Sequence, residues 1–266
     1  MGSGVEEEES VGNSMKKTSQ HSGQSSRPSS TLAEMPFREL IQTDVELRKL
    51  REQYASQSAE KRRRAAEWAY DSAHASMLMA DALKEPDWCD PTWHDSAAPL
   101  AIDPEYASAI LTVGSLEYQY GRVDEAMLLF LKLTTLRADL DVLPEIIDQA
   151  GEFLIDAKDL ANAERLYSAA VSDFPQVAIY HSGLGYCAGR NGRKEEAVAH
   201  AQRAVDLEPE NCKLLNDLGY SLIESRQYEE AEKTLRRAVE LAPADYTLPA
   251  GNLEHLMRLR TTTGHD

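Results

Sequence analysis

Two stretches of the chain follow one pattern: LGYCAGRNGRKEEAVAHAQRAVDLEP at 184–209 and LGYSLIESRQYEEAEKTLRRAVELAP at 218–243. A Leu-Gly pair, two alanines and a closing proline recur in the second stretch 34 residues after their places in the first. A fixed period of this length is typical of arrays in which each copy forms one structural unit that stacks on the next. We therefore expect a repeat array in this part of the chain.

The pattern continues toward the N-terminus of the chain. A further step of 34 residues reaches Gly151, Ala163 and Pro175, which keep the same order of small residues and proline. A weaker copy starts near Ala107 and is followed by a connection three residues longer. The array is expected to span 104–243, with repeats at about 107–140, 144–177, 178–211 and 212–245.

Each copy reads as two antiparallel helices joined by a polar turn. The glycine of the first helix and the alanines of the second let the two helices approach each other, and the proline stops the second helix. Because one hairpin cannot cover its own apolar face, neighbouring hairpins have to stack. The sequence thus predicts an all-α fold.

This pattern resembles the tetratricopeptide repeat family, and the resemblance covers about Ala107 to Pro243, roughly half of the chain. It implies a right-handed α-α superhelix, or solenoid, of about four helical hairpins. One landmark departs from the family pattern, which has a large aromatic residue four positions before the glycine. The residues found at that position here are Ile110, Ile147, His181 and Leu215.

The flanking segments differ in composition from the array. Residues 1–34 are rich in serine, glycine and acidic side chains, so we expect a disordered tail. Residues 35–85 are good helix formers with apolar side chains at helical spacing, which predicts a helical extension of two packed helices or one bent helix. Its basic run Lys61–Arg64 is either a targeting signal or phosphate contact, or a solvated helix face, which the acidic surroundings favour. Residues 244–266 are expected to form a capping helix and a tail.

The segment 86–103 is rich in proline and tryptophan and is expected to be a linker. Its stretch DWCDPTWHD at 87–95 is either a metal site or a structural plug. A zinc site needs about four ligands, mainly nitrogen or sulfur donors, and only Cys89 and His94 qualify nearby. We favour the plug, in which the two tryptophans cover the N-terminal end of the array or join it to the preceding helices.

Charge and motifs exclude several classes of function. Twenty-eight Lys and Arg against 45 Asp and Glu give a net charge of −17, which repels nucleic acid. No apolar run reaches the roughly 18 residues that span a bilayer, and no signal peptide is recognisable, so we expect a cytoplasmic protein without membrane insertion. Three cysteines without a CxxC pair fit a reducing compartment. Because no nucleophile, zinc, P-loop or dinucleotide motif is supported, we expect no enzyme activity, cofactor or metal.

The resemblance also implies a binding surface. In similar arrays the first helix of each hairpin lines a concave groove, at fixed positions of the repeat. Mapped onto this chain, these positions are acidic in the second repeat and carry equivalent tyrosines in the third and fourth. The candidate groove residues are Tyr118, Glu145, Asp148, Glu152, Ser182, Tyr186, Lys213, Asn216, Tyr220 and Glu224.

The chemistry of these positions indicates the kind of ligand. Many family members bind acidic chaperone tails through a clamp of lysine, arginine and asparagine side chains, and this chain departs from that clamp. Its equivalent residues are Ser182, Gly183 and Tyr186, or Asn216, Asp217 and Tyr220. We expect instead a peptide or protein surface with basic and apolar parts, unless the groove residues are only a soluble surface.

The main functional interpretation is a non-enzymatic adaptor or scaffold for protein–protein interaction. One alternative is a dedicated secretion or assembly chaperone, for which the groove would hold an apolar segment. The other is a regulatory or docking subunit of an enzyme complex, for which the helices of 35–85 would be the docking surface. Fold alone does not decide among them, since one fold serves many functions.

Overall fold

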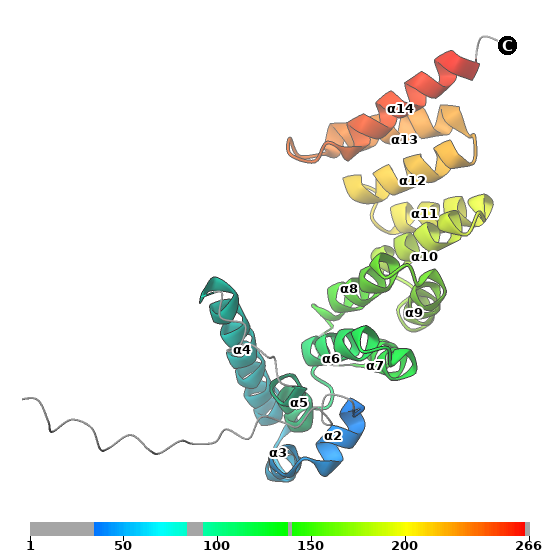
Figure 1. The fold of residues 1–266 in the computed structure, drawn as a ribbon. Helices are drawn as coiled ribbons and strands as arrows, with labels where there is room; N and C mark the ends of the chain where they lie inside the picture. The colour runs from blue at the N-terminus through cyan, green and yellow to red at the C-terminus, as the bar shows by residue number, and fades with distance from the viewer. Residues whose placement is uncertain (1–34, 84–92, 138–139, 264–266) are drawn as a thin grey trace, which may run out of the picture.

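The computed structural model describes residues 35–83, 93–137 and 140–263, and the regular elements in these ranges are all α-helices. The helices of the second half form pairs that stack into an elongated array (Figure 1). This confirms the expected all-α solenoid. The tail expected at 1–34 lies outside the described residues. None of the described helices combines the length and the apolar character that crossing a membrane requires.

Four helical hairpins form the array. In each hairpin a short turn joins a first helix to a second helix that packs against it. The hairpins are α6 (Ala107–Gln119) with α7 (Val123–Thr135), α8 (Leu143–Asp156) with α9 (Leu160–Asp173), α10 (Ala178–Arg190) with α11 (Lys194–Leu207), and α12 (Cys212–Glu224) with α13 (Tyr228–Leu241). The first helices of neighbouring hairpins also contact one another, so each hairpin covers the apolar face of the next.

The turn inside each hairpin places one residue in the left-handed region of φ. Two hairpins use glycine, Gly121 with φ 79° and Gly192 with φ 78°. The other two use Lys158 with φ 65° and Arg226 with φ 63°. This conformation costs a residue with a Cβ roughly 1–2 kcal/mol of conformational free energy, whereas glycine adopts it without that cost. Two of the four turns are therefore made against the conformational preference of their residue.

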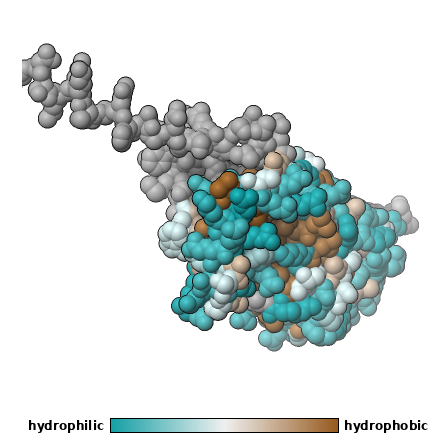
Figure 2. Space-filling view, turned by 90° about the horizontal axis from the view of Figure 1, so that it is seen from below, coloured by the Kyte–Doolittle hydropathy of each residue, from teal (hydrophilic) through white to brown (hydrophobic). Residues whose placement is uncertain are grey.

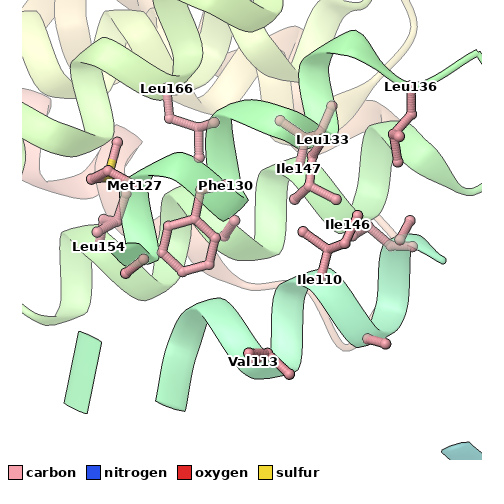
Figure 3. Close-up of a cluster of buried hydrophobic side chains, with 14 of the residues drawn as sticks. Ile110, Val113, Met127, Phe130, Leu133, Leu136, Ile146, Ile147, Leu154 and Leu166 are labelled. Atoms are coloured by element: carbon pink, nitrogen blue, oxygen red, sulfur yellow. The ribbon is translucent and has the colours of Figure 1, made fainter. Parts of the chain in front are cut away.

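The glycines of the first helices face large side chains of the second helices. A Cβ built on Gly114 would lie 2.5 Å from the ring of Phe130, and one built on Gly219 would lie 2.5 Å from Leu235. Phe130 in turn lies among buried aliphatic side chains of the first two hairpins (Figure 3). The sequence interpretation, in which glycine brings two helix backbones together, is thus incomplete: in these hairpins glycine makes room for a bulky neighbour.

The N-terminal extension contains three helices where the sequence suggested two, or one bent helix. Asp44 makes the additional break, because its side chain accepts hydrogen bonds from the backbone N–H of Glu46 and Leu47, each at 2.9 Å. A side chain in this role ends one helix and caps the next. The helices are α2 (Phe37–Thr43), α3 (Val45–Ala55) and α4 (Ala59–Leu83).

The segment 86–103 is not a plain linker, because Trp93–Ile102 form helix α5. Pro99 lies inside this helix. Proline is a poor residue for a helix interior, but Leu100, Ala101 and neighbouring residues of α5 are buried in the core. Burial of this apolar face outweighs the low helix propensity, which composition alone could not show.

The extension docks on the first hairpin. Glu117 of α6 is buried, accepts a hydrogen bond from the backbone N–H of Phe37 at 2.5 Å and pairs with Arg122. Arg63, within the basic run of α4, forms an ion pair of 2.7 Å with Asp103. The basic run is therefore not only a solvated face, since one of its arginines joins α4 to the segment before the array.

Two clusters of buried apolar side chains meet in the third hairpin. One extends from Phe37 to Cys187 and the other from Ala178 to Leu256. Helix α14 (Leu248–Thr263) packs against α12 and α13, and its Leu256 is fully buried. Seen from the N-terminal end of the array, an apolar area framed by hydrophilic side chains is visible on the surface (Figure 2). The array thus lies between the N-terminal helices and α14.

Candidate binding groove

A cavity of about 1390 Å³ follows the first helices of the second, third and fourth hairpins. It extends along α8, α10 and α12 as far as Asn252 of α14. Stacking places equivalent positions of successive repeats side by side, which is why side chains far apart in sequence share this surface. The cavity contains nine of the ten candidate residues: Glu145, Asp148, Glu152, Ser182, Tyr186, Lys213, Asn216, Tyr220 and Glu224.

Tyr118, the tenth candidate, lies outside the cavity lining. Its hydroxyl donates to Asp159 Oδ2 at 3.0 Å, and its ring packs edge-on against Phe153 at 5.4 Å between centroids. Both partners belong to the second hairpin or its turn, so Tyr118 joins the first hairpin to the second. The first hairpin is also contacted by the extension, since the Tyr70 hydroxyl of α4 lies 3.2 Å from Thr112 Oγ1 of α6.

Asp148 is a carboxylate of the groove that is held by a buried side chain. It accepts a hydrogen bond of 2.7 Å from the hydroxyl of Tyr167, a buried residue of α9. The Tyr167 ring reaches the groove between Gly151 and Gly183, where an added Cβ would lie 2.3 and 2.4 Å from it. Burial raises the pKa of Asp148 to about 6, and nearby carboxylates including Glu152 add to this effect, while the hydrogen bond opposes it.

Asp217 of α12 extends the acidic surface to the fourth hairpin. Its Oδ2 accepts a hydrogen bond of 2.9 Å from Ser182 of α10. The surrounding protein raises the pKa of Asp217 by displacing water, although hydrogen bonds from Ser182 and Asn216 partly oppose this. Asn216 in turn accepts from the Asn252 amide at 2.8 Å. A row of polar groups therefore crosses the floor of the groove from the third hairpin to α14.

The charge of the groove is predominantly negative. Carboxylates outnumber basic side chains by eight to three among the lining residues. One of the three cations, Lys194, is held 3.8 Å from Glu224. The acidic residues are Asp141, Glu145, Asp148, Glu152, Asp156, Glu208, Asp217 and Glu224, and the basic ones are Arg190, Lys194 and Lys213. A concave surface lined by one sign of charge concentrates ligands of the opposite sign.

Aromatic side chains are presented in the same groove. Tyr186 is 47% exposed and Tyr220 is 49% exposed, and they occupy equivalent positions of the third and fourth hairpins. Ile179 adds an exposed aliphatic side chain to the lining. Exposed tyrosines are common anchors of protein interfaces, because a rigid ring gives a large contact area and a hydroxyl gives a hydrogen bond.

Among the lining residues outside the candidate set, three take part in the polar contacts described above: Asp217, Asn252 and Tyr167. Asp217 directly follows the mapped position Asn216 in α12, and both side chains line the cavity. Asn252 belongs to the capping helix, to which the repeat positions do not apply. Tyr167 lies on a second helix, and only the glycines at 151 and 183 could have indicated that a large ring passes between them.

The other sites weighed from the sequence have different outcomes. The stretch 87–95 was expected to be either a metal site or a structural plug. Residues 87–92 and the side chains of 93–95 lie outside the described part of the structure, so both alternatives stay predictions. In the described part, no group of three or more His, Cys, Asp or Glu side chains is arranged to hold a metal ion. Cys187 is buried, and burial raises the pKa of its thiol to about 11, which is the behaviour of a small packing residue.

Two family models match the chain, both described as tetratricopeptide repeat, at residues 151–211 and 188–248. A comparison with curated proteins gives no match. Among solved structures, the tetratricopeptide domain of Sgt2 from Aspergillus fumigatus is 21% identical, with a TM-score of 0.42, 46% of this chain covered and 82% of that one. MamA from Desulfovibrio magneticus is 18% identical, with a TM-score of 0.45, 66% of this chain covered and 94% of that one.

Because both TM-scores lie below 0.5, the assignment rests on the two repeat models and on the hairpins themselves. The models cover the second, third and fourth hairpins, which form the groove, from the glycine of α8 onward. The repeat period, the helix pairs and the family models agree over this region. The chain is therefore a tetratricopeptide repeat protein.

Proposed function

We propose that the protein is a non-enzymatic adaptor that binds an extended peptide, or such a segment of a partner protein, in the groove of the second to fourth hairpins. One observation carries the proposal: first-helix positions of three successive repeats meet in one cavity of about 1390 Å³. Tetratricopeptide arrays are used for protein interaction, and this surface combines exposed tyrosines with excess negative charge. The ligand we propose has basic and apolar side chains.

The charges of the groove argue against an acidic chaperone tail as the ligand. Such a peptide would face Asp148, Glu152 and Asp217, where a clamp for carboxylates needs cations. The alternative of a dedicated secretion or assembly chaperone involves the same groove and differs in requiring an almost wholly apolar segment. The negative charge of the groove makes a mixed basic and apolar segment the better match.

The proposal can be tested with a peptide-display selection on the folded full chain. The comparison is with a Tyr186→Ala/Tyr220→Ala variant, in which two half-exposed rings of the groove are removed, and circular dichroism checks that the variant is folded. Selected peptides should be enriched in Lys, Arg and aliphatic residues and should bind the variant at least tenfold more weakly. Peptides that are acidic, or that bind the variant as tightly as the wild type, would refute the proposal.

One observation favours docking through the N-terminal extension as a second function. Trp68 on α4 is 73% exposed, and an exposed tryptophan is uncommon unless another surface covers it. A regulatory or docking subunit would use this face for a stable partner. Affinity purification from native extract with wild type and Trp68→Ala distinguishes the two functions, because a partner lost only from the Trp68 variant binds the extension and not the groove.

A further inference from the structure

Three carboxylates of α8 give the groove negative charge that the described side chains leave uncompensated. Glu145, Asp148 and Glu152 all line the cavity, and their spacing of three and four residues places them on one helix face, where like charges repel. Within the described ranges none of the three forms an ion pair, whereas Glu164 on α9 pairs with Arg193 at 2.6 Å. This part of the groove therefore favours a ligand segment that carries positive charge.

The chain itself contains a segment of that kind. Residues 10–33 carry three basic side chains and no Asp or Glu, and they are the longest run of the sequence without a carboxylate. Met15 directly precedes Lys16 and Lys17, so these three residues combine apolar and basic side chains. The acidic run Glu6–Glu9 is separated from Met15 by five residues. Met15–Lys17, which lies outside the described residues, thus belongs to the class of ligand proposed for the groove.

The length of the chain allows this segment to reach the groove of the same molecule. The backbone N–H of Phe37 donates to Glu117 of α6, so the described chain begins beside the first hairpin. Helix α6 contacts α8, and α8 contacts α10 (Figure 1). At about 8–10 Å between packed helices, α10 is roughly 20 Å from this point. Residues 18–34 span up to roughly 55 Å when extended, at about 3.3 Å per residue. The reach therefore exceeds the distance.

We propose that Met15–Lys17 occupies the groove of its own chain and competes there with the partner peptide. Lys16 and Lys17 lie against the carboxylates of α8, and Met15 packs on the exposed ring of Tyr186. The inference rests on the proposed function, because it names a competitor for the same groove. A tethered segment meets its site at an effective concentration on the order of millimolar, so a weak interaction is sufficient. A partner has to displace the segment before it binds.

Occupancy is tested by photocrosslinking in the full chain. Tyr186 is replaced by p-benzoylphenylalanine, and irradiation is followed by gel separation, digestion and mass spectrometry. Cross-links from position 186 to residues 10–20 are expected in the band of single-chain mass. The matched control position is Tyr120, which is 53% exposed and does not line the cavity, and it should give at least fivefold fewer of these cross-links.

Two results of this experiment would overturn the inference. One is the absence of cross-links from position 186 to residues 10–20. The other is their restriction to a band of twice the single-chain mass, which would assign the groove to the N-terminal segment of a second copy.

Competition is tested with Lys16→Ser/Lys17→Ser and with the matched control Arg27→Ser. The probe is a fluorescein-labelled peptide with the sequence of residues 10–22, SVGNSMKKTSQHS, and its binding is followed by fluorescence anisotropy. The double variant weakens the tethered competitor, so the probe should bind it at least fivefold more tightly than wild type. Arg27→Ser removes a charge outside Met15–Lys17 and should change the affinity less than twofold. Equal affinity for wild type and the double variant would overturn the inference.

The failure of this inference can be told from the failure of the proposed function. If the probe is insensitive to Lys16 and Lys17 but displayed peptides still depend on Tyr186 and Tyr220, only the present inference is refuted. If no displayed peptide depends on these tyrosines, the proposed function and the competition are refuted together.

Discussion

The hydroxyl of Tyr167 meets Asp148 Oδ1 at 2.7 Å, so a residue buried between two helices holds a carboxylate at the surface of the groove. The ring fits there because residues 151 and 183 are both glycine. Asp148 cannot turn freely into solvent, and its partly desolvated charge is kept beside other carboxylates. The stability of the fold and the charge of the groove are therefore linked through one side chain.

Asp148→Asn should stabilise the fold at neutral pH. The folded pKa of about 6 lies above the ordinary value of 3.8, so the folded state binds the proton more tightly and the free energy of unfolding falls as pH rises from about 4 to about 6. Removing the charge should raise this free energy by about 1–3 kcal/mol at pH 7.5 and by less than about 1 kcal/mol at pH 4. Urea unfolding of wild type and Asp148→Asn at both pH values measures the free energy of unfolding. An equal increase at pH 7.5 and at pH 4 would contradict the role of the Asp148 charge.

Binding of a basic peptide should weaken on acidification. Asp148 loses its charge below pH 6, and Asp217, whose pKa is also raised, contributes in the same direction. Between pH 7.5 and pH 5 the dissociation constant should rise about threefold to tenfold, as expected for the loss of one or two partly exposed charges. Asp148→Asn should reduce the dependence on pH without removing it. Anisotropy titrations with an Arg-containing peptide, which does not titrate in this range, provide the measurement.

The two non-glycine turns offer a simple gain in stability. Lys158→Gly and Arg226→Gly should each raise the free energy of unfolding by about 0.5–1 kcal/mol, because the left-handed conformation costs nothing for glycine while its extra freedom in the unfolded chain cancels part of the benefit. Lys158→Ala is the control and should change stability little. A gain for alanine equal to that for glycine would show that the lysine side chain, and not its backbone, is unfavourable.

Glu117 should be essential for docking of the N-terminal helices. Glu117→Ala leaves Arg122 without its buried carboxylate and the Phe37 N–H without an acceptor, and breaking a buried pair from one side costs about 3–5 kcal/mol. Limited proteolysis should then cleave between residues 35 and 102 while the fourth hairpin stays protected. Glu125→Ala, which removes a partly exposed ion pair with Arg38, should have little effect. Unchanged protection in Glu117→Ala would contradict this role.

The array and most of its groove follow from the sequence because repetition itself carries the information. Once Gly185 and Gly219 fix the period, every equivalent position is known, and stacking brings those positions together. What the period does not cover could not be predicted. The break at Asp44 depends on one side-chain cap, and the helix around Pro99 depends on burial against distant residues. Tyr118 has the repeat position of a groove residue, but its neighbours in the second hairpin occupy its ring and hydroxyl.

Both faces at which the array could continue are already occupied. Helices α2 and α5 contact the first hairpin side through Phe37 and the shared core, and α14 buries Leu256 against the fourth. A hairpin added at either end would have to displace these covering helices, whereas duplication of an internal hairpin would leave both of them in place. The number of hairpins between the two ends therefore sets the length of partner that the groove can bind. Evolution toward a longer partner is expected to proceed by duplication of an internal hairpin, which would duplicate its binding residues as well.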